Sequence, residues 1–319
     1  IPEGGFLFRI WAPGAASVAL KLFRRGEPAL LPMTPLPGGW YQLAVAEAAY
    51  GDRYMFRIND ELDVPDPASR FQLDDVHGPS LLVDPGAFPW TDEAWKSRAW
   101  EETVLYELHV GTFTPEGTYQ AARERLDELV DLGVTAIELM PVADFPGSRN
   151  WGYDGVLPYA PDSVYGTPED LKALIDAAHA RGLMVFLDVV YNHFGPEGNY
   201  LYVYARDFFT ERHHTPWGAA IDFSVPEVRR FFIENTLYWL NEYHFDGIRY
   251  DAVHAIYDDS EKHFLAELSQ AVRQGPGRAR RIHLVLENDD NIADWFHRDT
   301  GKQPDLYTAQ WNDDVHHVF

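Results

Sequence analysis

From Thr103 onward, short apolar runs alternate with amphipathic segments, and this alternation limits the possible folds more than any other feature of the chain. The runs that we interpret as strands are residues 104–110, 135–142, 183–190, 246–253, 282–288 and 305–311. Apolar side chains at helical spacing lie between them, in residues 119–132, 168–181, 226–244 and 261–273. The first of these segments carries on one side Leu126, Leu129, Val130 and Leu132. The alternation predicts parallel strands with right-handed crossovers, in a doubly wound sheet or a (β/α)8 barrel.

Polar side chains at the ends of the predicted strands favour the barrel. They are Asp188, Asn192, Arg249, Asp251, Glu287, Asn288, Gln310 and Asn312. Active sites of (β/α)8 barrels form at the carboxyl ends of the strands. We therefore predict an α/β protein with a catalytic barrel over residues 103–319. About six strands precede Phe319, and an open sheet of that size leaves unpaired edges, so we expect the barrel to be truncated.

The first part of the chain has a different pattern. Short alternating runs such as FLFRIWAP and DRYMFRIN are separated by Pro and Gly, as is typical of a small β-sandwich of immunoglobulin-like type. We assign residues 1–88 to this domain. The stretch from Pro85 to Glu102 holds two prolines and three tryptophans, which indicates a linker that packs against the barrel, and we place this linker at residues 89–102.

Composition excludes several classes of partner. The 26 basic and 50 acidic residues give a net charge of −24, which repels nucleic acid and anionic membranes. The chain has 0 cysteines, which fits a reducing compartment, and no apolar run approaches the roughly 18 residues of a membrane span. The N-terminal segment also lacks the features of a secretory signal. We therefore expect a cytoplasmic protein without a nucleic-acid or membrane partner, and its oligomeric state stays open.

Two carboxylates are predicted to face one cavity. Strand alternation places Arg249 and Asp251 on one face of GIRYD, opposite Ile248 and Tyr250. The arginine can pair with the aspartate, which removes the cost of burying either charge alone. The next strand brings Glu287 to the same rim. One ionised and one protonated carboxyl group are the minimum for glycoside hydrolysis.

The environment of each carboxyl group is expected to differ. Arg249 would keep Asp251 ionised, whereas apolar walls and like charge would raise the pKa of Glu287. An alternative is that both are structural carboxylates at strand ends. His193, which follows the in-phase pair Asp188 and Asn192, and His254 both flank the predicted mouth.

Three segments carry a resemblance to a known family. They are DVVYNH (188–193), GIRYDAVH (247–254) and LVLEN (284–288), which resemble the first three signature regions of the α-amylase superfamily of glycoside hydrolases. The resemblance implies that Asp251 is the nucleophile and Glu287 the general acid/base. It also implies that Arg249 orients the nucleophile and that His193 donates a hydrogen bond to the sugar. Sandwich modules of the kind predicted here precede barrels in branching and debranching members.

Further residues gain roles from the same resemblance. Tyr153 matches the aromatic residue on which the sugar stacks, His254 lies beside the next subsite, and Asp188 is structural. Five segments resemble members that cleave the α-1,4 bond next to a terminal trehalose unit: FPGSRNWGYDGV (145–156), YNHFGPEGNYL (191–201), WGAAIDF (217–223), LENDDN (286–291) and AQWNDDVHH (309–317). An oligosaccharide, maltooligosyltrehalose, is then the expected substrate. Additional candidates for lining the cleft are Trp217, Asp222, Asp289, Asp290 and Trp311. We predict no cofactor and no metal site, although calcium near Asn192 is left open.

One departure keeps alternatives open. The family has a third essential acid in an Asn-His-Asp signature, and this sequence contains no such tripeptide. A branching or debranching enzyme of the same superfamily would use the same carboxylates with a different acceptor. A non-catalytic glucan-binding protein would keep the cleft without turnover.

Overall fold

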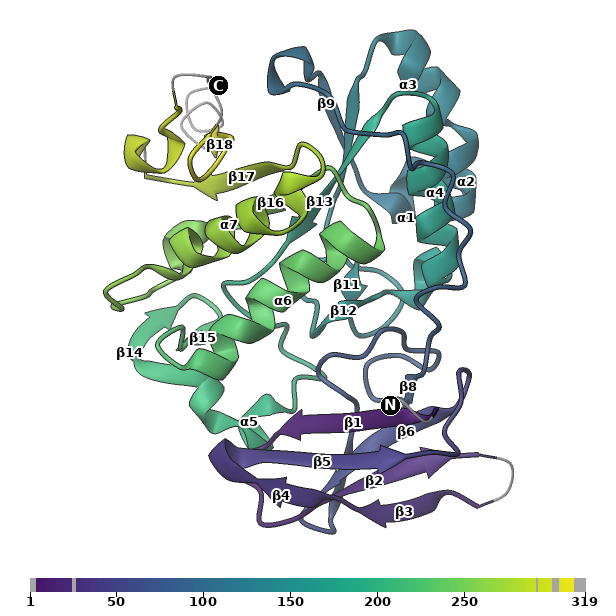
Figure 1. Cartoon of the computed structure of the whole chain (residues 1–319), viewed down its shortest axis with the longest axis vertical. Helices are drawn as coiled ribbons and strands as arrows, with labels where there is room; N and C mark the ends of the chain where they lie inside the picture. Colours follow the sequence, from purple (N-terminus) through teal and green to yellow (C-terminus); the bar gives the residue numbers. More distant parts are fainter. Residues whose placement is uncertain (1–3, 25–26, 291, 300–303, 313–319) are drawn as a thin grey trace.

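The structure is a computed structural model that describes residues 4–24, 27–290, 292–299 and 304–312. It places an all-β part below an α/β part, and the segment between them runs up the side of the molecule (Figure 1). Among the described residues, no helix is long and apolar enough to cross a membrane.

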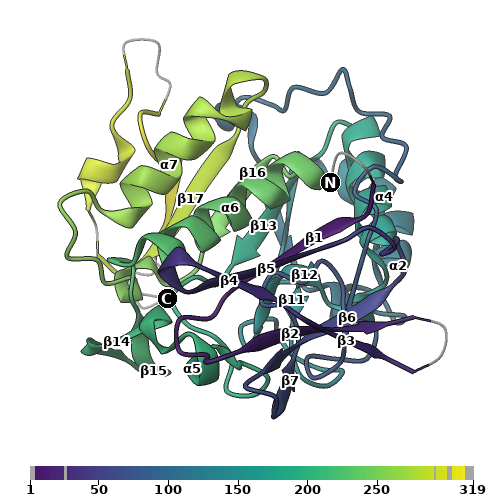
Figure 2. The ribbon, with the colours of Figure 1, turned by 60° about the horizontal axis from the view of Figure 1, so that its bottom comes forward.

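The N-terminal part is a sandwich of two antiparallel sheets (Figure 2). One sheet has the order β1 (Phe6–Trp11), β5 (Trp40–Val45), β4 (Thr34–Leu36). The other has the order β3 (Ala29–Pro32), β2 (Val18–Phe23), β6 (Arg53–Ile58), β7 (Leu62–Val64), with β8 (Ser80–Leu81) also paired to β6. Strand alternation explains the core, because Phe8 and Ile10 are buried while Leu7 and Arg9, which alternate with them, are exposed. The expected immunoglobulin-like β-sandwich is confirmed.

The second part is built on one parallel sheet. Its order is β18 (Ala309–Asn312), β17 (His283–Asn288), β16 (Gly247–Tyr250), β13 (Met184–Val189), β10 (Ala136–Leu139), β9 (Leu105–Leu108). These strands coincide with the predicted runs, and their spatial order follows the chain, as in a barrel rather than in a doubly wound sheet. The predicted barrel fold is confirmed, with β9 and β18 as the edges within the described residues.

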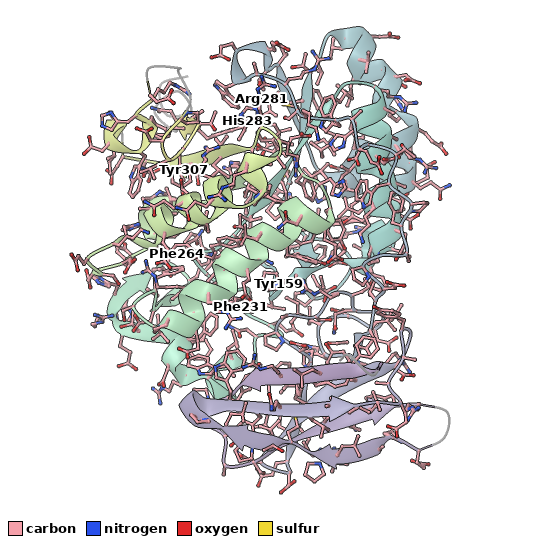
Figure 3. The ribbon with its side chains drawn as sticks, viewed as in Figure 1. Tyr159, Phe231, Phe264, Arg281, His283 and Tyr307 are labelled. Atoms are coloured by element: carbon pink, nitrogen blue, oxygen red, sulfur yellow. The ribbon has the colours of Figure 1, made fainter. Side chains whose placement is uncertain are left out.

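Helices alternate with these strands as expected. They are α1 (Val110–Phe113), α2 (Tyr119–Glu124), α3 (Leu126–Leu132), α4 (Pro168–Ala180), α5 (Leu201–Tyr204), α6 (Pro226–Glu242) and α7 (Phe264–Gln274). Local signals explain the start of α4, where Thr167 and Asp170 form a capping box and Pro168 occupies the first turn. On α6, Phe231 accepts a 2.6 Å hydrogen bond from Tyr159 through its carbonyl, and their rings contact edge to face (Figure 3).

Two hairpins extend the carboxyl-end loops of the sheet. One pairs β11 (Ala143–Asp144) with β12 (Leu157–Pro161), and the other pairs β14 (Phe209–Thr215) with β15 (Gly218–Ile221). The second hairpin carries Trp217 at its turn.

The predicted apolar face of residues 119–132 is partly wrong. The segment divides into α2 and α3 at Arg125, and Leu126 and Leu129 are buried. Val130 and Leu132 instead have 38% and 70% of their surface exposed. Leu132 lies six positions after Leu126, which at 100° per residue turns it away from the buried face.

The segment before the barrel packs against it through tryptophan rings. Trp90 stacks on His244 with ring centroids 3.9 Å apart, and Trp95 stacks on His179 at 5.0 Å. The Trp95 indole also donates to Asp246 at 2.8 Å. These contacts attach the segment to α4 and to the residues between α6 and β16.

His179 is the centre of this attachment. Its two ring nitrogens lie 2.8 Å from Asp92 and 2.9 Å from Asp246, and all three side chains are almost fully buried. Burial alone would lower the pKa of His179, but the hydrogen bonds to the two carboxylates raise it above its ordinary value. The imidazole is therefore held as a cation between two anions.

We predict that His179→Gln lowers the free energy of unfolding by about 3–5 kcal/mol at pH 6, because it leaves buried carboxylates without their cation. Since the folded pKa is raised, the stabilisation by His179 is full below about pH 6.5 and is lost as pH rises through the folded value. Urea unfolding between pH 5 and 9 measures this. The control His77→Gln, in an exposed pair with Glu197, should show no such change. An equal loss for His179→Gln at every pH contradicts a cationic His179.

Candidate active site

Arg249 on β16 lies at the centre of a buried group of carboxylates. Its Nη1 donates to Asp188 at 2.5 Å and lies 3.5 Å from Asp251 Oδ1. Its Nη2 lies 3.9 Å from Glu287 Oε2, and its Nε lies 3.9 Å from Glu138 Oε1. One guanidinium thus faces four carboxyl groups from the four neighbouring strands β10, β13, β16 and β17 or their ends.

The surroundings prevent all of these acids from being ionised together. Burial raises the pKa of Asp188 to about 7, even though Arg249 opposes the shift. Burial, reinforced by the charge of Asp188, raises the pKa of Glu138 well above its ordinary value. Burial would lower the pKa of Arg249, but Asp188 raises it overall. The Arg249 guanidinium therefore stays charged, and the raised pKa values of Asp188 and Glu138 favour their protonated forms.

Asp251 follows directly after β16, and its side chain is 14% exposed. The side-chain amide of Asn192 donates to both its carboxylate and its backbone carbonyl at 2.9 Å. Its own backbone N–H donates to the carbonyl of Val189 on the adjacent strand at 3.0 Å. The carboxylate is therefore fixed on one side by an arginine and on the other by an amide.

Glu287 lies near the end of β17 and is 9% exposed. Its Oε2 accepts a hydrogen bond from the backbone N–H of Ala252, immediately after Asp251. Ala252 has φ 43°, in the left-handed region that alanine seldom adopts. This strained turn directs its N–H at the glutamate and joins the two carboxylate-bearing segments.

Tyr153 and His193 extend the network. The Tyr153 hydroxyl donates to Asp188 at 3.0 Å, and its carbonyl accepts from His193 Nε2 at 2.9 Å. The other ring nitrogen of His193 lies 2.5 Å from Asn192 Oδ1. Burial lowers the pKa of His193, against the charge of Asp251. Trp217 stacks on His193 with centroids 4.0 Å apart and an interplanar angle of 4°, and half of its surface is exposed.

The residues predicted from the sequence divide into two groups. A connected network of contacts joins Tyr153, Asp188, Asn192, His193, Arg249, Asp251 and Glu287, with Trp217 stacked on its edge. His254 and Asp290 lie outside it. His254 is 3.5 Å from Asp289, and the exposed Asp290 donates its N–H to Asn288.

The other candidates for lining the cleft lie in separate places. Trp311 lies on β18 with its ring 5.3 Å from the Arg249 guanidinium carbon. Asp222 instead accepts hydrogen bonds from Arg212 and Ser224 as part of a turn. The last residues of the segment AQWNDDVHH lie outside the described residues.

Glu138 was not identified from the sequence. It lies in the middle of β10, is fully buried, and neither carboxyl oxygen has a hydrogen-bond partner among the described residues. The signal was a charged residue within the apolar run TAIELM, which requires a partner inside the fold. That partner, Arg249, comes from a strand more than 100 positions later and could not be assigned from the pattern alone.

Comparisons with known proteins agree with this geometry. Residues 90–217 match the alpha amylase catalytic domain, and residues 1–76 match carbohydrate-binding module 48, the isoamylase N-terminal domain. A malto-oligosyltrehalose trehalohydrolase from Deinococcus radiodurans is 48% identical over 99% of this chain and 50% of its own length. The chain belongs to the α-amylase family.

Two further proteins have a comparable sequence identity to this chain. A malto-oligosyltrehalose trehalohydrolase from Saccharolobus solfataricus is 43% identical, over 100% of this chain and 55% of its own. A crystal structure from Salmonella typhimurium, provisionally classed as an α-amylase, superposes with a TM-score of 0.93 at 52% identity. It aligns over 97% of this chain and 52% of that chain. The chain spans about half the length of the curated relatives it matches.

We predict that Glu138→Gln changes the free energy of unfolding by less than about 1 kcal/mol at pH 5, since the amide replaces a protonated acid of the same shape. Because the folded pKa of Glu138 is raised, the wild-type protein loses stability as pH rises above about 4.3. The variant should therefore gain stability relative to wild type between pH 5 and pH 9. Denaturant titrations at both pH values measure the difference, and a constant difference would show that Glu138 is ionised throughout.

Proposed function

We propose that this chain forms the catalytic centre of a retaining glycoside hydrolase that cleaves maltooligosyltrehalose and releases trehalose. The observation that carries the proposal is that Asp251 and Glu287, from adjacent strands, face the same guanidinium. The substrate is supported by the names of the relatives that match nearly the whole chain. The proposed layout is a sandwich over residues 1–88, a linker over 89–102 and a barrel over 103–319.

Asp251 is the proposed nucleophile. Arg249 lies 3.5 Å from its Oδ1 and Asn192 donates to its Oδ2, and these contacts restrict the rotation of the carboxylate. Attack by one carboxylate oxygen on the anomeric carbon forms a glycosyl ester as the bond to the leaving oxygen breaks.

Glu287 is the proposed general acid and base. Its side chain is less exposed than that of Asp251, and the backbone N–H of Ala252 donates to its carboxyl group. In the first step its proton passes to the leaving oxygen. In the second step it takes a proton from water, which attacks the anomeric carbon, and the bond from that carbon to Asp251 breaks to free the carboxylate.

The remaining residues of the network are proposed to bind the sugar. His193 and Tyr153 lie on the same side of Asp251 as Asn192, and the flat Trp217 ring adds an apolar face for a pyranose. Asp188 accepts hydrogen bonds from Arg249 and Tyr153 and so fixes the orientation of both side chains. His254 and Asp290 are proposed to contact more distant sugar units.

Kinetics of variants of the full-length protein test the two assignments. Glu287→Gln should reduce the rate on maltooligosyltrehalose by about 10²–10⁴-fold, since general acid assistance is lost. On an aryl glucoside whose leaving group needs no proton, formation of the ester should be largely spared. Asp251→Asn should abolish the ester with both substrates, detected by mass spectrometry after rapid quenching. The exposed Glu234→Gln serves as the matched control.

Two results would contradict these roles. An equal loss for Glu287→Gln on both substrates at the ester-forming step excludes it as the acid. A glycosyl ester on a residue other than Asp251 excludes Asp251 as the nucleophile.

Stereochemistry and substrate choice give an independent test. We predict that the sugar released has the α configuration at the new reducing end in the first minutes of reaction, as retention requires. Proton NMR of the anomeric signals measures it, and initial release of the β anomer would indicate inversion. Free trehalose from maltooligosyltrehalose, with little cleavage or branching of amylose, separates the proposed function from that of a branching or debranching enzyme.

A further inference from the structure

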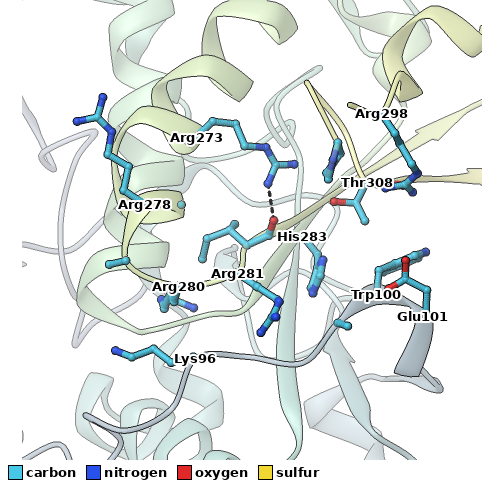
Figure 4. Close-up of a pocket in the computed structure, with 15 residues that line it drawn as sticks. Lys96, Trp100, Glu101, Arg273, Arg278, Arg280, Arg281, His283, Arg298 and Thr308 are labelled. Atoms are coloured by element: carbon cyan, nitrogen blue, oxygen red, sulfur yellow. Dashed lines mark hydrogen bonds between the residues drawn. The ribbon is translucent and has the colours of Figure 1, made fainter. Parts of the chain in front are cut away.

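A cavity of about 570 Å³ lies at the amino ends of β17 and β18, the opposite ends from the carboxylate network (Figure 4). Its lining comes from residues 96–101 before the barrel, from Arg273 on α7, from residues 277–283 after that helix, and from the separate residues Arg298, Pro304 and Thr308. Their side chains approach the cavity from different directions, so the chain's fold rather than its local sequence creates the space.

Basic side chains dominate the lining. They are Lys96, Arg273, Arg278, Arg280, Arg281 and Arg298. Glu101 is the one acidic residue among the described residues that line the cavity. The whole chain has nearly twice as many acidic as basic residues, 50 against 26, so this local excess of positive charge opposes the overall composition.

Two of the arginines are positioned by neutral groups. Arg273 donates through Nη1 to the carbonyl of Ile282 at 2.6 Å and through Nη2 to that of Leu306 at 2.8 Å. These carbonyls fix the guanidinium without cancelling its charge. Burial lowers the pKa of Arg273, and the charge of Arg298 adds to the effect. Arg273 and Arg298 are therefore held close together although their positive charges repel each other.

Arg280 is held in the same way. Its Nη2 donates to the carbonyls of Leu240 and Phe245, each at 2.7 Å. Its Nη1 is buried without a hydrogen bond and lies 3.6 Å from Asp246, whose carboxylate already accepts from His179 and Trp95. The negative charge of Asp246 therefore compensates the positive charge of Arg280 only in part.

Arg278 and Arg281 remain available for a ligand. Both are exposed, and neither side chain has a hydrogen bond or ion pair with any described residue. Arg281 lies beside His283 at the start of β17 (Figure 3). A guanidinium presents a planar fork of donors that matches the oxygens of a phosphoryl group.

We propose that this cavity is a binding site for a small molecule that carries a phosphoryl group. Its volume falls within the range of roughly 300–1,000 Å³ that is typical of small-ligand sites. Fixed arginines at its wall and free arginines at its mouth supply the positive charge and the donors that a phosphate dianion requires. The proposal concerns the face of the barrel opposite the catalytic centre and does not depend on glycosidase activity.

Binding to the full-length protein tests the proposal directly. Inorganic phosphate, pyrophosphate, glucose 6-phosphate and glucose are titrated by calorimetry at constant ionic strength, and thermal unfolding is followed in parallel. We expect saturable binding of at least one of the three phosphates with a raised Tm, and none of glucose. The most tightly bound compound distinguishes an inorganic phosphate from a sugar phosphate as the source of the group.

Paired variants locate the site. Arg278→Gln combined with Arg281→Gln should weaken the Kd by about tenfold or more, since two charge-assisted contacts are lost. Arg125→Gln combined with Arg206→Gln removes the same charge from exposed positions elsewhere and should leave the Kd unchanged. The proposal is overturned if none of the phosphates binds saturably, if glucose binds equally well, or if both double variants behave alike.

Discussion

The pairing of Arg249 with the acids around it is the constraint on which the rest of the site depends. A single guanidinium faces Glu138, Asp188, Asp251 and Glu287, and charge balance in a buried site permits only part of this group to be ionised. The deeper acids, Glu138 and Asp188, have raised pKa values and lie against Arg249 from below. The shallower pair is left facing the open end of the strands, where a substrate can reach it.

The architecture was predictable because burial repeats regularly in this sequence. The four central parallel strands, β10, β13, β16 and β17, are buried on both faces, so each appears as an apolar run, and in-phase polar residues at the ends of β16 and β17 indicated Asp251 and Glu287. Contacts between distant segments were not predictable in the same way. Nothing local pairs Glu138 with Arg249 or places His179 between two aspartates, and the left-handed turn at Ala252 has no signal in its residue type.

The arginine-lined cavity shows the same limit. The run RARR at residues 278–281 is visible as a basic segment, but Lys96 and Arg298 join it only when the sheet brings the amino ends of its strands together. β17 connects the two ends of the barrel, since His283 lines the cavity and Glu287 belongs to the carboxylate network. His283 and Glu287 are four positions apart, which corresponds to roughly 13 Å of extended chain, so a single strand separates the arginine-lined cavity from the carboxylate network.

The stacking of Trp217 on His193 has a practical consequence. The indole is half exposed, lies flat against an imidazole, and belongs to a hairpin at the edge of the proposed sugar site. An imidazole in such contact can quench indole fluorescence by accepting an electron from the excited ring, and a pyranose inserted nearby would change both the distance and the polarity around the indole. Trp217 therefore provides an optical reporter for occupancy of the cleft, readable in solution without any label attached to the protein.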